Sequence, residues 1–326
     1  TPTIPRQQAR RCRPGTTRWT GHRHPATNTT RPHRLVLRRR PLRVHRQRRR
    51  HNGLGGGGRA PDRRQKPVKL SRGALVAATV AFAAVTVLAS SPARADAVPV
   101  VVPQVVATVP HDPAAYSEGL EFDGPVLYEA TGEVGKSQLR EVDPVTGRVI
   151  RSADLPPTYF GEGIAVVGDR IWQLTYKNGV AIEWDKATFT PIREVPVDVG
   201  GWGLCFDGNR LVSSDGTGRL FFHDPDTFAA TGSVAVTRDG QPVGGLNELD
   251  CVDGQVWAAA WPDDQFVRID PATGMVNLVL DVSGLWQSGN RTARQVVSGI
   301  AHISGQEFLI SGKDWPSSYR VRIDAA

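Results

Sequence analysis

One short unit occurs five times between Gly119 and Gly312: an apolar strand, a tight turn and a second apolar strand. Each first strand opens with Gly-Leu or a variant of it. The five openings are Gly119-Leu120, Gly163-Ile164, Gly203-Leu204, Glu248-Leu249 and Gly299-Ile300. A repeat this regular predicts a closed array of similar units. The residue in front of each first strand would then face one shared centre.

A second motif, Asp-Pro-x-Thr-Gly or a variant, recurs with the same period. It begins at Asp143, Asp185, Asp224 and Asp270, so that successive copies lie 42, 39 and 46 residues apart. In such a turn Asp caps the chain, Pro fixes its own φ, and Gly adopts the positive φ that closes the turn. Four short strands in about 40–50 residues are typical of a β-propeller blade. The sequence therefore predicts an all-β, five-bladed β-propeller.

The two ends of the repeat region predict how the ring closes. Residues 100–109 have a high β-propensity and no partner in their own repeat, and residues 319–323 alternate in polarity as a strand does. We expect these segments to pair within one blade, which closes the ring and removes an exposed sheet edge. Residues 96–326 would then form the propeller domain.

The N-terminal part of the chain differs from the rest in charge. Residues 1–95 hold 23 of the 40 Lys and Arg residues and one acid, Asp62, whereas the remaining 231 residues hold 17 basic and 31 acidic residues. The acidic remainder argues against nucleic acid as a partner. Residues 1–68 are too poor in apolar residues to form a core. We expect a disordered basic segment here and interpret it as sequence upstream of the true start.

Residues 69–95 have the pattern of a signal peptide. Lys69 and Arg72 precede an uncharged apolar run of 15 residues, 74–88, and the small-x-small pattern Ala-Arg-Ala follows at 93–95. The run is too short to span a membrane, which takes about 20 residues. We expect cleavage near Asp96 and export to the periplasm or the exterior, with no membrane anchor afterwards.

Cys205 and Cys251 are the only cysteines after this cleavage site, and both lie in first strands of neighbouring repeats. An oxidising compartment permits a disulfide between them, but two buried thiols explain the pattern equally well. The histidines of the mature chain, His111, His223 and His302, are scattered. The sequence therefore predicts no metal site and no cofactor, although a structural cation in the central channel is conceivable.

Two sets of positions should meet at one face, because the first strand of a blade runs along the axis and the second returns. The residues before the first strands are Glu118, Glu162, Trp202, Asn247 and Ser298, and those after the second strands are Gly132, Tyr176, Gly216, Trp261 and Lys313. They differ between repeats although their surroundings are alike, which favours a functional site. One cavity would then collect two carboxylates, an amide, an ammonium group and three aromatic rings.

Five unusual motifs surround these positions. They are Tyr-Ser-Glu-Gly-Leu at 116–120, Tyr-Phe-Gly-Glu-Gly-Ile at 159–164, Gly-Trp-Gly-Leu at 201–204, Leu-Asn-Glu-Leu at 246–249 and Gly-Lys-Asp-Trp-Pro at 312–316. In this order they resemble the plant and bacterial glutaminyl-peptide cyclotransferases, which are five-bladed propellers. The resemblance runs from about residue 111 to residue 316. Tyr116 and Tyr176 stand where that family usually has Phe and Trp, and we expect them to alter substrate preference.

The resemblance implies that the chain cyclises the N-terminal glutamine of peptides or proteins to pyroglutamate and releases ammonia, without a metal. The α-amine attacks the γ-carboxamide of its own residue, so the nucleophile is already tethered. The enzyme must keep the amine neutral and protonate a poor leaving group. Glu162, beside Phe160 in a poorly hydrated setting that should raise its pKa, is the expected general acid.

Each of the three other polar residues of the expected cavity has two candidate roles. Glu118 would bind the α-amine or tune Glu162. Asn247 would donate to the developing oxyanion or brace a loop. Lys313 would pair with Glu162 or stabilise the same oxyanion. The substrate-binding walls would be Trp202, Trp261 and Tyr176, with Phe160 and Tyr116 as further walls.

Two other functions fit the same residues. Five-bladed propellers also include glycosidases, in which Glu118 and Glu162 would be the acid/base pair, although such sites usually hold a third carboxylate. A non-catalytic propeller that binds peptide termini would keep the aromatic pocket without needing Glu162. In each case we expect a monomer.

Overall fold

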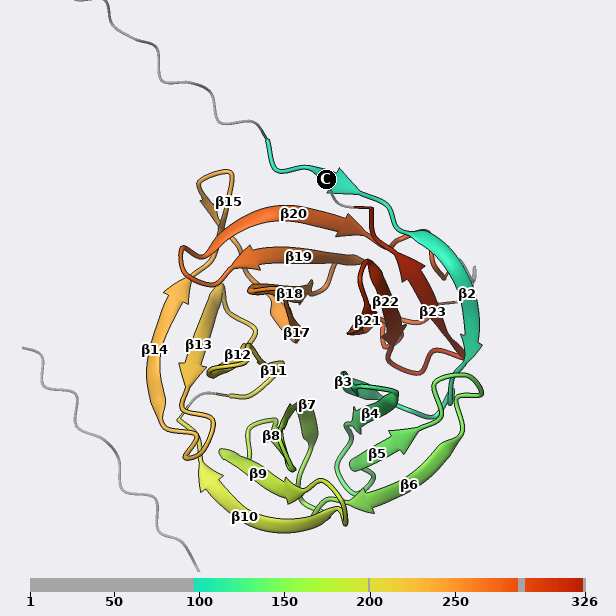
Figure 1. Cartoon of the computed structure of the whole chain (residues 1–326), viewed down its shortest axis with the longest axis vertical. Helices are drawn as coiled ribbons and strands as arrows, with labels where there is room; N and C mark the ends of the chain where they lie inside the picture. Colours follow the sequence, from blue (N-terminus) through green and yellow to red (C-terminus); the bar gives the residue numbers. More distant parts are fainter. Residues whose placement is uncertain (1–96, 199, 287–290, 325–326) are drawn as a thin grey trace, which may run out of the picture. The chain divides into compact units, whose positions relative to one another are not determined.

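The computed structural model describes residues 97–198, 200–286 and 291–324, all within one compact unit, Thr86–Ala326. The predicted basic segment at 1–68 and the predicted signal peptide at 69–95 lie outside the described residues. Every helix or strand in the described part of the chain is a β-strand, so the prediction of an all-β protein is confirmed. The strands form five sheets around a common centre, a propeller-like arrangement (Figure 1).

Three of the sheets are simple antiparallel runs of four consecutive strands. The first contains β3 (Ser117–Asp123), β4 (Val126–Thr131), β5 (Gln138–Val142) and β6 (Val149–Asp154). The second contains β7 (Gly161–Val167), β8 (Arg170–Thr175), β9 (Val180–Asp185) and β10 (Thr190–Pro196). The third contains β11 (Leu204–Phe206), β12 (Leu211–Ser213), β13 (Arg219–His223) and β14 (Ala230–Ala235).

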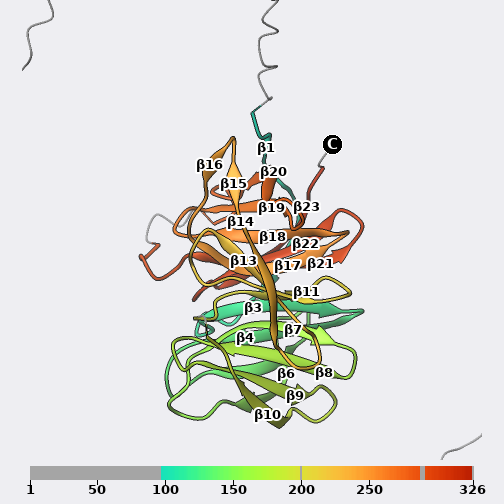
Figure 2. The same ribbon diagram turned by 90° about the vertical axis from the view of Figure 1, so that its left-hand side faces the viewer.

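The fourth sheet is larger because it carries additions at its outer edge. Its four main strands are β17 (Leu246–Val252), β18 (Gln255–Ala260), β19 (Gln265–Asp270) and β20 (Met275–Asp281). A hairpin of β15 (Thr237–Arg238) and β16 (Gln241–Pro242) pairs with β20. This hairpin stands out from the sheets around it (Figures 1 and 2).

The fifth sheet joins the two ends of the described chain. It contains β21 (Val297–Ser304), β22 (Glu307–Gly312), β23 (Ser317–Arg322) and, outermost, β2 (Gln104–Pro110). β2 pairs antiparallel with β23, so the predicted pairing of the N- and C-terminal strands is confirmed for residues 104–109. The prediction is wrong for residues 100–101. They form β1 (Val100–Val101), which pairs in parallel with β20, since Pro103 interrupts the ladder and cannot donate to it.

The predicted aspartate turns join the third and fourth strands of the first four sheets. Each begins with a carboxylate that accepts N–H bonds from residues two or three positions later, at Asp143, Asp185, Asp224 and Asp270. The closing residue has a positive φ whether it is Gly147 (68°) or Phe228 (60°). The turn geometry is therefore kept even where the side chain disfavours it.

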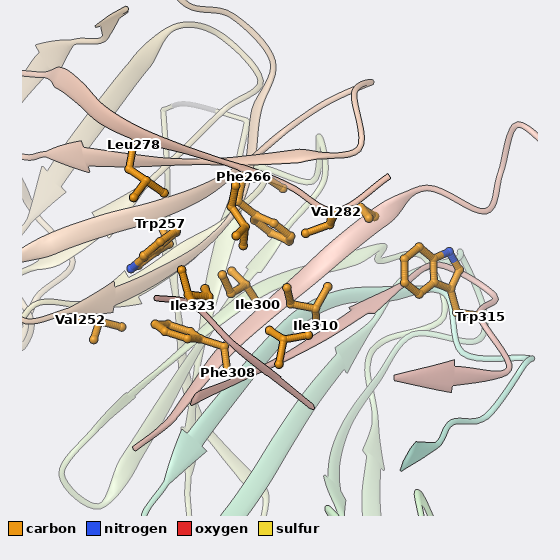
Figure 3. Packing of buried hydrophobic residues seen from close by; sticks show 14 residues of the cluster. Val252, Trp257, Phe266, Leu278, Val282, Ile300, Phe308, Ile310, Trp315 and Ile323 are labelled. Carbon is orange, nitrogen blue, oxygen red and sulfur yellow. The ribbon is translucent and has the colours of Figure 1, made fainter. Parts of the chain in front are cut away.

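Five clusters of buried apolar side chains pack the sheets against one another. The largest lies between the fourth and fifth sheets, where Trp257 and Phe266 meet Ile300 and Phe308 (Figure 3). The smallest joins the fifth sheet back to the first through side chains such as Leu309 and Leu127. Successive residues of an innermost strand point to opposite faces, as in any strand, and so serve two clusters. This packing leaves the ends of the innermost strands free to build a site.

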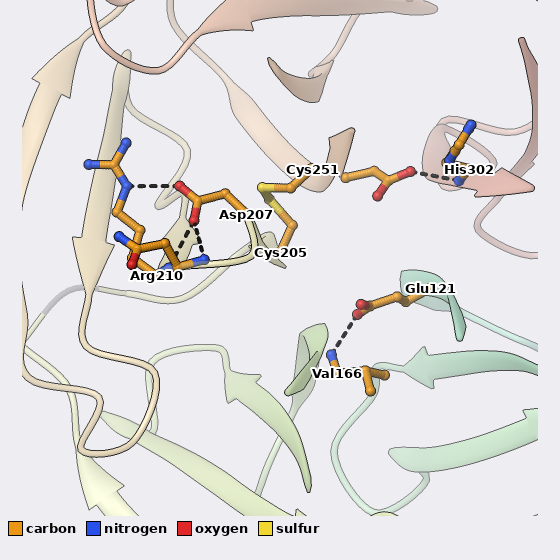
Figure 4. The surroundings of a disulfide bond; sticks show 9 residues. Glu121, Val166, Cys205, Asp207, Arg210, Cys251 and His302 are labelled. Atoms are coloured by element: carbon orange, nitrogen blue, oxygen red, sulfur yellow. Dashed lines mark hydrogen bonds and ion pairs between the residues drawn. A yellow bond between two sulfur atoms is a disulfide. The ribbon is translucent and has the colours of Figure 1, made fainter. Parts of the chain in front are cut away.

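The innermost strands β3, β7, β11, β17 and β21 surround the centre (Figure 1), and each contacts the next, with β21 contacting β3. A disulfide joins Cys205 of β11 to Cys251 of β17, with a Cα–Cα distance of 5.5 Å (Figure 4). The structure thus decides between the disulfide and the two thiols that the sequence left open. No helix in the described residues is long and apolar enough to cross a membrane.

Three carboxylates on the innermost strands bond to backbone N–H groups of neighbouring sheets. Glu121 accepts from Val166 at 2.8 Å, and Asp250 accepts from the backbone N of His302 at 2.6 Å (Figure 4). Glu248 accepts from backbone N–H groups of both the first and the fifth sheets. Burial raises the pKa of all three carboxyls, that of Asp250 to about 6. They connect sheets that share no strand-to-strand ladder.

Candidate active site

β-Bulges mark the start of four innermost strands. The register slips between Ser117 and Gly119 in the first sheet, and at the corresponding point of the second, fourth and fifth sheets. These slips contain Glu118, Glu162, Asn247 and Ser298. A bulge leaves one residue outside the ladder and re-aims its side chain, which is why such irregularities recur beside active sites. The sequence places these residues in front of each first strand, and the bulge turns them toward the centre.

The ends of the second strands are held by an equivalent backbone bond in four sheets. Each residue after a second strand donates its N–H to a carbonyl just before the first strand of the same sheet. The pairs are Gly132 to Tyr116, Tyr176 to Phe160, Trp261 to Gly245 and Lys313 to Val296. The two sets of positions that the repeat predicts to be equivalent therefore do lie beside each other.

A cavity of about 330 Å³ opens at this face, in the size range of small-molecule sites. Its wall consists of all nine predicted site residues: Tyr116, Glu118, Phe160, Glu162, Tyr176, Trp202, Asn247, Trp261 and Lys313. Ser298, also predicted to face the centre, does not line it, because its hydroxyl donates to the carbonyl of Ser117 at 2.9 Å. Gly132 and Gly216 contribute space rather than side chains.

The five aromatic residues form a continuous belt around the cavity. Ring centroids are 6.1 Å apart for Tyr116–Phe160, 5.7 Å for Phe160–Tyr176, 6.4 Å for Tyr176–Trp202 and 5.9 Å for Trp202–Trp261. These are edge-to-face and tilted contacts, the arrangement that aromatic quadrupoles favour. Trp261 is 46% exposed and forms the outer end of the belt. A group inside the belt is shielded from water over much of its surface.

The charged residues of the cavity form a buried chain. The Lys313 Nζ atom lies 2.5 Å from Glu118 Oε2, and both side chains are buried. The contact is an ion pair rather than an aligned hydrogen bond, since Glu118 Oε2 has no hydrogen-bond partner among the described residues. The Glu118 and Glu162 carboxyls line the same cavity and lie close enough for each to influence the pKa of the other. Lys313 therefore pairs with Glu118, so the predicted pairing of Lys313 with Glu162 is wrong, and its predicted role at the oxyanion stays a prediction.

The pKa values of the two carboxyls are raised to different extents. Burial raises the pKa of Glu162 well above its usual range, and the neighbouring Glu118 carboxylate raises it further. Burial also raises the pKa of Glu118, but the attraction of Lys313 opposes the shift. Two close carboxyls that compete for one proton in this way leave it on the member farther from the cation. Lys313 thus favours the charge on Glu118 and the proton on Glu162.

Lys313 remains an ammonium group in this setting. Burial lowers its pKa, but the charges of Glu118 and Glu162 more than offset this, and the net shift of the Lys313 pKa is upward. Its Nζ atom also lies 4.7 Å from the centre of the Tyr116 ring, a cation–π contact. The tyrosine that departs from the family pattern thus contacts the buried charge directly.

Asn247 supplies the amide of the site. Its side-chain oxygen is buried with no hydrogen-bond partner in the described residues, while its backbone carbonyl accepts from Ser214 Oγ at 2.6 Å. A buried amide oxygen without a partner is costly in a folded protein, unless a ligand donates to it. The Asn247 oxygen can therefore accept from a bound substrate, and the NH2 group of the same side chain is the one that can donate.

Two cations that the sequence analysis did not single out lie over the belt. The Arg294 guanidinium is 4.6 Å from the centre of the Tyr116 ring, and Lys177 Nζ is 4.5 Å from that of Tyr176. Arg294 is held by Glu133 and Asp314. Lys177 directly follows a site residue, which was a usable signal, but Arg294 belongs to no repeated motif. No group of three or more potential metal ligands occurs in the described part of the chain.

Comparison with known proteins now adds to this geometry. Residues 76–323 match the glutamine cyclotransferase family. The chain belongs to this family. It is 37% identical over 230 residues to the glutaminyl-peptide cyclotransferase of Arabidopsis thaliana, which covers 68% of this chain and 72% of the plant protein. The crystal structure of Myxococcus xanthus glutaminyl cyclase is similar to the fold with a TM-score of 0.66 and 35% identity, covering 71% of this chain and all of the other.

Proposed function

We propose that this chain is a glutaminyl-peptide cyclotransferase, which converts the N-terminal glutamine of a peptide to pyroglutamate and releases ammonia. The observation that carries the proposal is the buried chain from Lys313 through Glu118 to Glu162 inside an aromatic cavity. It supplies one carboxylate and one carboxylic acid side by side. Family membership supports the same activity.

The first step needs a neutral amine near a carboxylate. Glu118, kept ionised by Lys313, accepts an N–H of the α-amine and orients the nitrogen toward the γ-carbon of the same residue. The nitrogen attacks that carbon and forms the ring bond, and the carboxamide oxygen gains negative charge. Asn247 donates to this oxygen from the cavity wall, where a preorganised amide is an effective stabiliser.

The second step breaks the bond between the γ-carbon and the amide nitrogen. Glu162, protonated because of its raised pKa, gives its proton to that nitrogen, which leaves as ammonia. The attacking nitrogen loses one proton to Glu118. Glu118 then returns this proton to the neighbouring Glu162, so that the site regains its starting state. The net change is one proton moved from the amine to the leaving nitrogen.

Family membership speaks against a glycosidase. The active-site cavity supplies two carboxyls, Glu118 and Glu162, where glycosidase sites of this fold usually hold a third. A peptide-binding propeller without activity would gain nothing from the raised pKa of Glu162.

The test is incubation of the protein with a peptide that begins with glutamine. We expect one ammonia molecule per peptide and a peptide mass lower by that of ammonia. A peptide that begins with asparagine is the control, because its side chain is one carbon too short to form the same ring. If the glutamine peptide is unchanged, the proposed activity is wrong.

We propose further that the five sheets are the five blades of a closed ring. The contact of β21 with β3, the apolar cluster between the fifth and first sheets and the pairing of β2 with β23 support this arrangement. A crystal structure in which β23 has another neighbour than β2 would contradict it.

We propose export of the protein, as a monomer and with no membrane anchor, on the basis of residues 69–95. The disulfide supports this, since disulfides persist mainly in oxidising compartments. Mass spectrometry of protein produced from the full sequence should find a chain that starts near Asp96, and light scattering should give one chain per particle. A cell-associated product that retains residues 69–95 would overturn the export proposal.

A further inference from the structure

A second and larger cavity adjoins the candidate active site. Its volume is about 540 Å³, and its wall includes Ala114, Gly132, Ser137 and Asp154. We propose that this adjoining cavity receives the residues that follow the N-terminal glutamine of a peptide substrate and favours a basic side chain there. The proposal rests on the cyclase activity proposed above.

The two cavities share a thin wall. Tyr116 lines both of them. Gly132 lines the adjoining cavity, and a Cβ atom added to it would lie 2.4 Å from Phe160 and 3.0 Å from Glu118, both in the wall of the active-site cavity. The backbone of Gly132 and the ring of Tyr116 therefore lie where the two spaces meet.

The floor of the adjoining cavity is also tied to the catalytic strand. The Ser137 hydroxyl accepts a hydrogen bond from the backbone N of Gly161 at 2.9 Å, next to Glu162. It donates in turn to the carbonyl of Glu133, at 2.8 Å. The loop between β4 and β5, which supplies much of the wall of the adjoining cavity, is thus tied to the strand that carries Glu162.

The chemistry of the substrate sets the direction in which its chain leaves the active site. The α-amine and the carbonyl that leads to the second residue are attached to the same carbon atom. A peptide whose amine lies at Glu118 must therefore leave the active-site cavity beside Glu118. Gly132 packs against Glu118 there, and Gly132 and Tyr116 both line the adjoining cavity.

The charges of the adjoining cavity favour a basic side chain. Lys136 pairs with Glu133 at 3.0 Å, and Arg140 pairs with Asp112 at 3.1 Å. Asp154 has no ion pair within the described residues and accepts a hydrogen bond only from Gln138, at 2.7 Å. It is the one charge of this wall left to attract a Lys or Arg side chain of the substrate.

A third cavity provides the alternative exit and hence the control. Its volume is about 370 Å³, it shares Trp261 with the active site, and its wall includes Gln241. Trp261 and Tyr116 are the two ends of the aromatic belt. A chain that left over Trp261 would depend on this third cavity and not on the adjoining one.

Substitution of Ala114, an exposed residue, by tryptophan reduces the adjoining cavity from a position that does not line the active-site cavity. We expect Ala114→Trp to lower kcat/KM for a glutamine-initiated tetrapeptide at least tenfold, and to leave that for glutamine amide within twofold. Gln241→Trp, its matched control in the third cavity, should leave both unchanged. Activity on glutamine amide also reports that each variant is folded.

The charge preference is tested with the peptides Gln-Lys-Ala-Ala and Gln-Glu-Ala-Ala. The wild type should prefer the first, and Asp154→Asn should reduce the preference about two- to fivefold, the effect of an exposed ion pair. An unchanged tetrapeptide rate in Ala114→Trp, a loss in Gln241→Trp instead, or an unchanged preference in Asp154→Asn overturns the proposal. Wild-type protein that cyclises no glutamine substrate would instead contradict the cyclase activity itself.

Discussion

At the scale of single residues, Lys313, Glu118 and Glu162 together hold charges that none of them could keep alone in a buried site. An ammonium group, a carboxylate and a carboxylic acid add up to zero charge. Burying an uncompensated charge is costly, and burying this neutral set is less so. The acid and the base of the proposed reaction therefore exist side by side before the substrate arrives.

The first consequence concerns Glu162. Replacing Glu162 with glutamine removes the transferable proton but keeps the shape and a hydrogen-bond donor, so we expect kcat to fall by about 10²–10⁴-fold. Ammonia release under saturating peptide measures this. Glu121→Gln is the matched control, because Glu121 also has a raised pKa but bonds to Val166 outside the cavity. Near-normal turnover in Glu162→Gln would rule out Glu162 as the general acid.

The second consequence concerns the pH dependence. Lys313 lowers the pKa of both carboxyls, so its removal in Lys313→Met lets both pKa values rise. Activity needs Glu118 ionised, which sets the acid side of the profile, and Glu162 protonated, which sets the alkaline side. Both sides of the profile of kcat/KM should therefore move to higher pH, together with a fall in its maximum. Lys313→Arg keeps the charge and should keep the profile; equal profiles for wild type and Lys313→Met would refute the ion pair's role.

At the scale of elements, the site depends on how the innermost strands begin. A bulge in front of Gly119 and of Ile164 turns Glu118 and Glu162 toward the cavity. Glycine just after a second strand leaves room for the aromatic rings of the belt. Gly132 admits the Phe160 ring and Gly216 admits that of Trp202, each closer than a side chain would permit.

Gly132 provides the prediction at this scale. In Gly132→Ala the new Cβ would lie 2.4 Å from Phe160, so the ring must move out of the belt and press on Glu118. We expect kcat/KM to fall at least tenfold while the circular dichroism spectrum stays that of the wild type. Gly244→Ala, where nothing lies within 4 Å of the new Cβ, is the control. A Gly132→Ala enzyme as active as the control would mean that the belt does not have to be intact.

The repeat explains why so much of the site could be predicted. Residues one period apart occupy equivalent places, so aligning the repeats of the sequence is enough to place Glu118, Glu162 and Asn247 in one cavity. The repeat period does not reveal which of these side chains form ion pairs with one another. The ion pair of Lys313 with Glu118 rather than with Glu162 depends on side-chain directions set by the bulges. The repeat also could not predict the path of the N-terminal segment, because β1 pairs with β20 of the fourth sheet whereas β2 belongs to the fifth.

The role of the buried carboxylates in linking the sheets could not be predicted for a related reason. Glu248 stands where the four other repeats have glycine, at 119, 163, 203 and 299, and this looked like a variant of the motif. In the structure its side chain bonds to the backbone N–H groups of Leu120 and Ile300. One large residue among small ones links sheets that are far apart in the sequence, which a comparison of repeats with one another cannot reveal.

At the scale of the whole molecule, the weakest joint should be the one between the last and first sheets, because the smallest apolar cluster lies there. Polar contacts of His111 reinforce it. Its ring nitrogens contact the carbonyl of Trp315 at 2.6 Å and the carboxylate of Glu129 at 2.9 Å, and its backbone N donates to Pro316. When both ring nitrogens of a histidine face acceptors, both must be protonated for each to donate a hydrogen bond.

The joint should therefore respond to pH. Burial lowers the pKa of His111, but Glu129 and the Trp315 carbonyl raise it more, so its folded pKa lies above its usual value of 6.5. A group with a raised folded pKa stabilises the protein fully below its unfolded pKa, and this contribution is lost as the pH rises through the folded pKa. The pKa of Glu129 is lowered despite its burial, mainly by His111, and its contribution is lost in acid.

Wild-type protein should thus lose unfolding free energy as the pH rises above 6.5 and through the raised folded pKa of His111, by an amount that His111→Gln does not lose. Guanidinium unfolding at several pH values measures this, with the slope of the transition as a check that both proteins unfold alike. His302→Gln is the control, since the His302 ring bonds only within its own turn through Gly305. A His111→Gln protein whose stability falls with pH as steeply as the wild type's would show that the joint between the last and first sheets holds without the charge on His111.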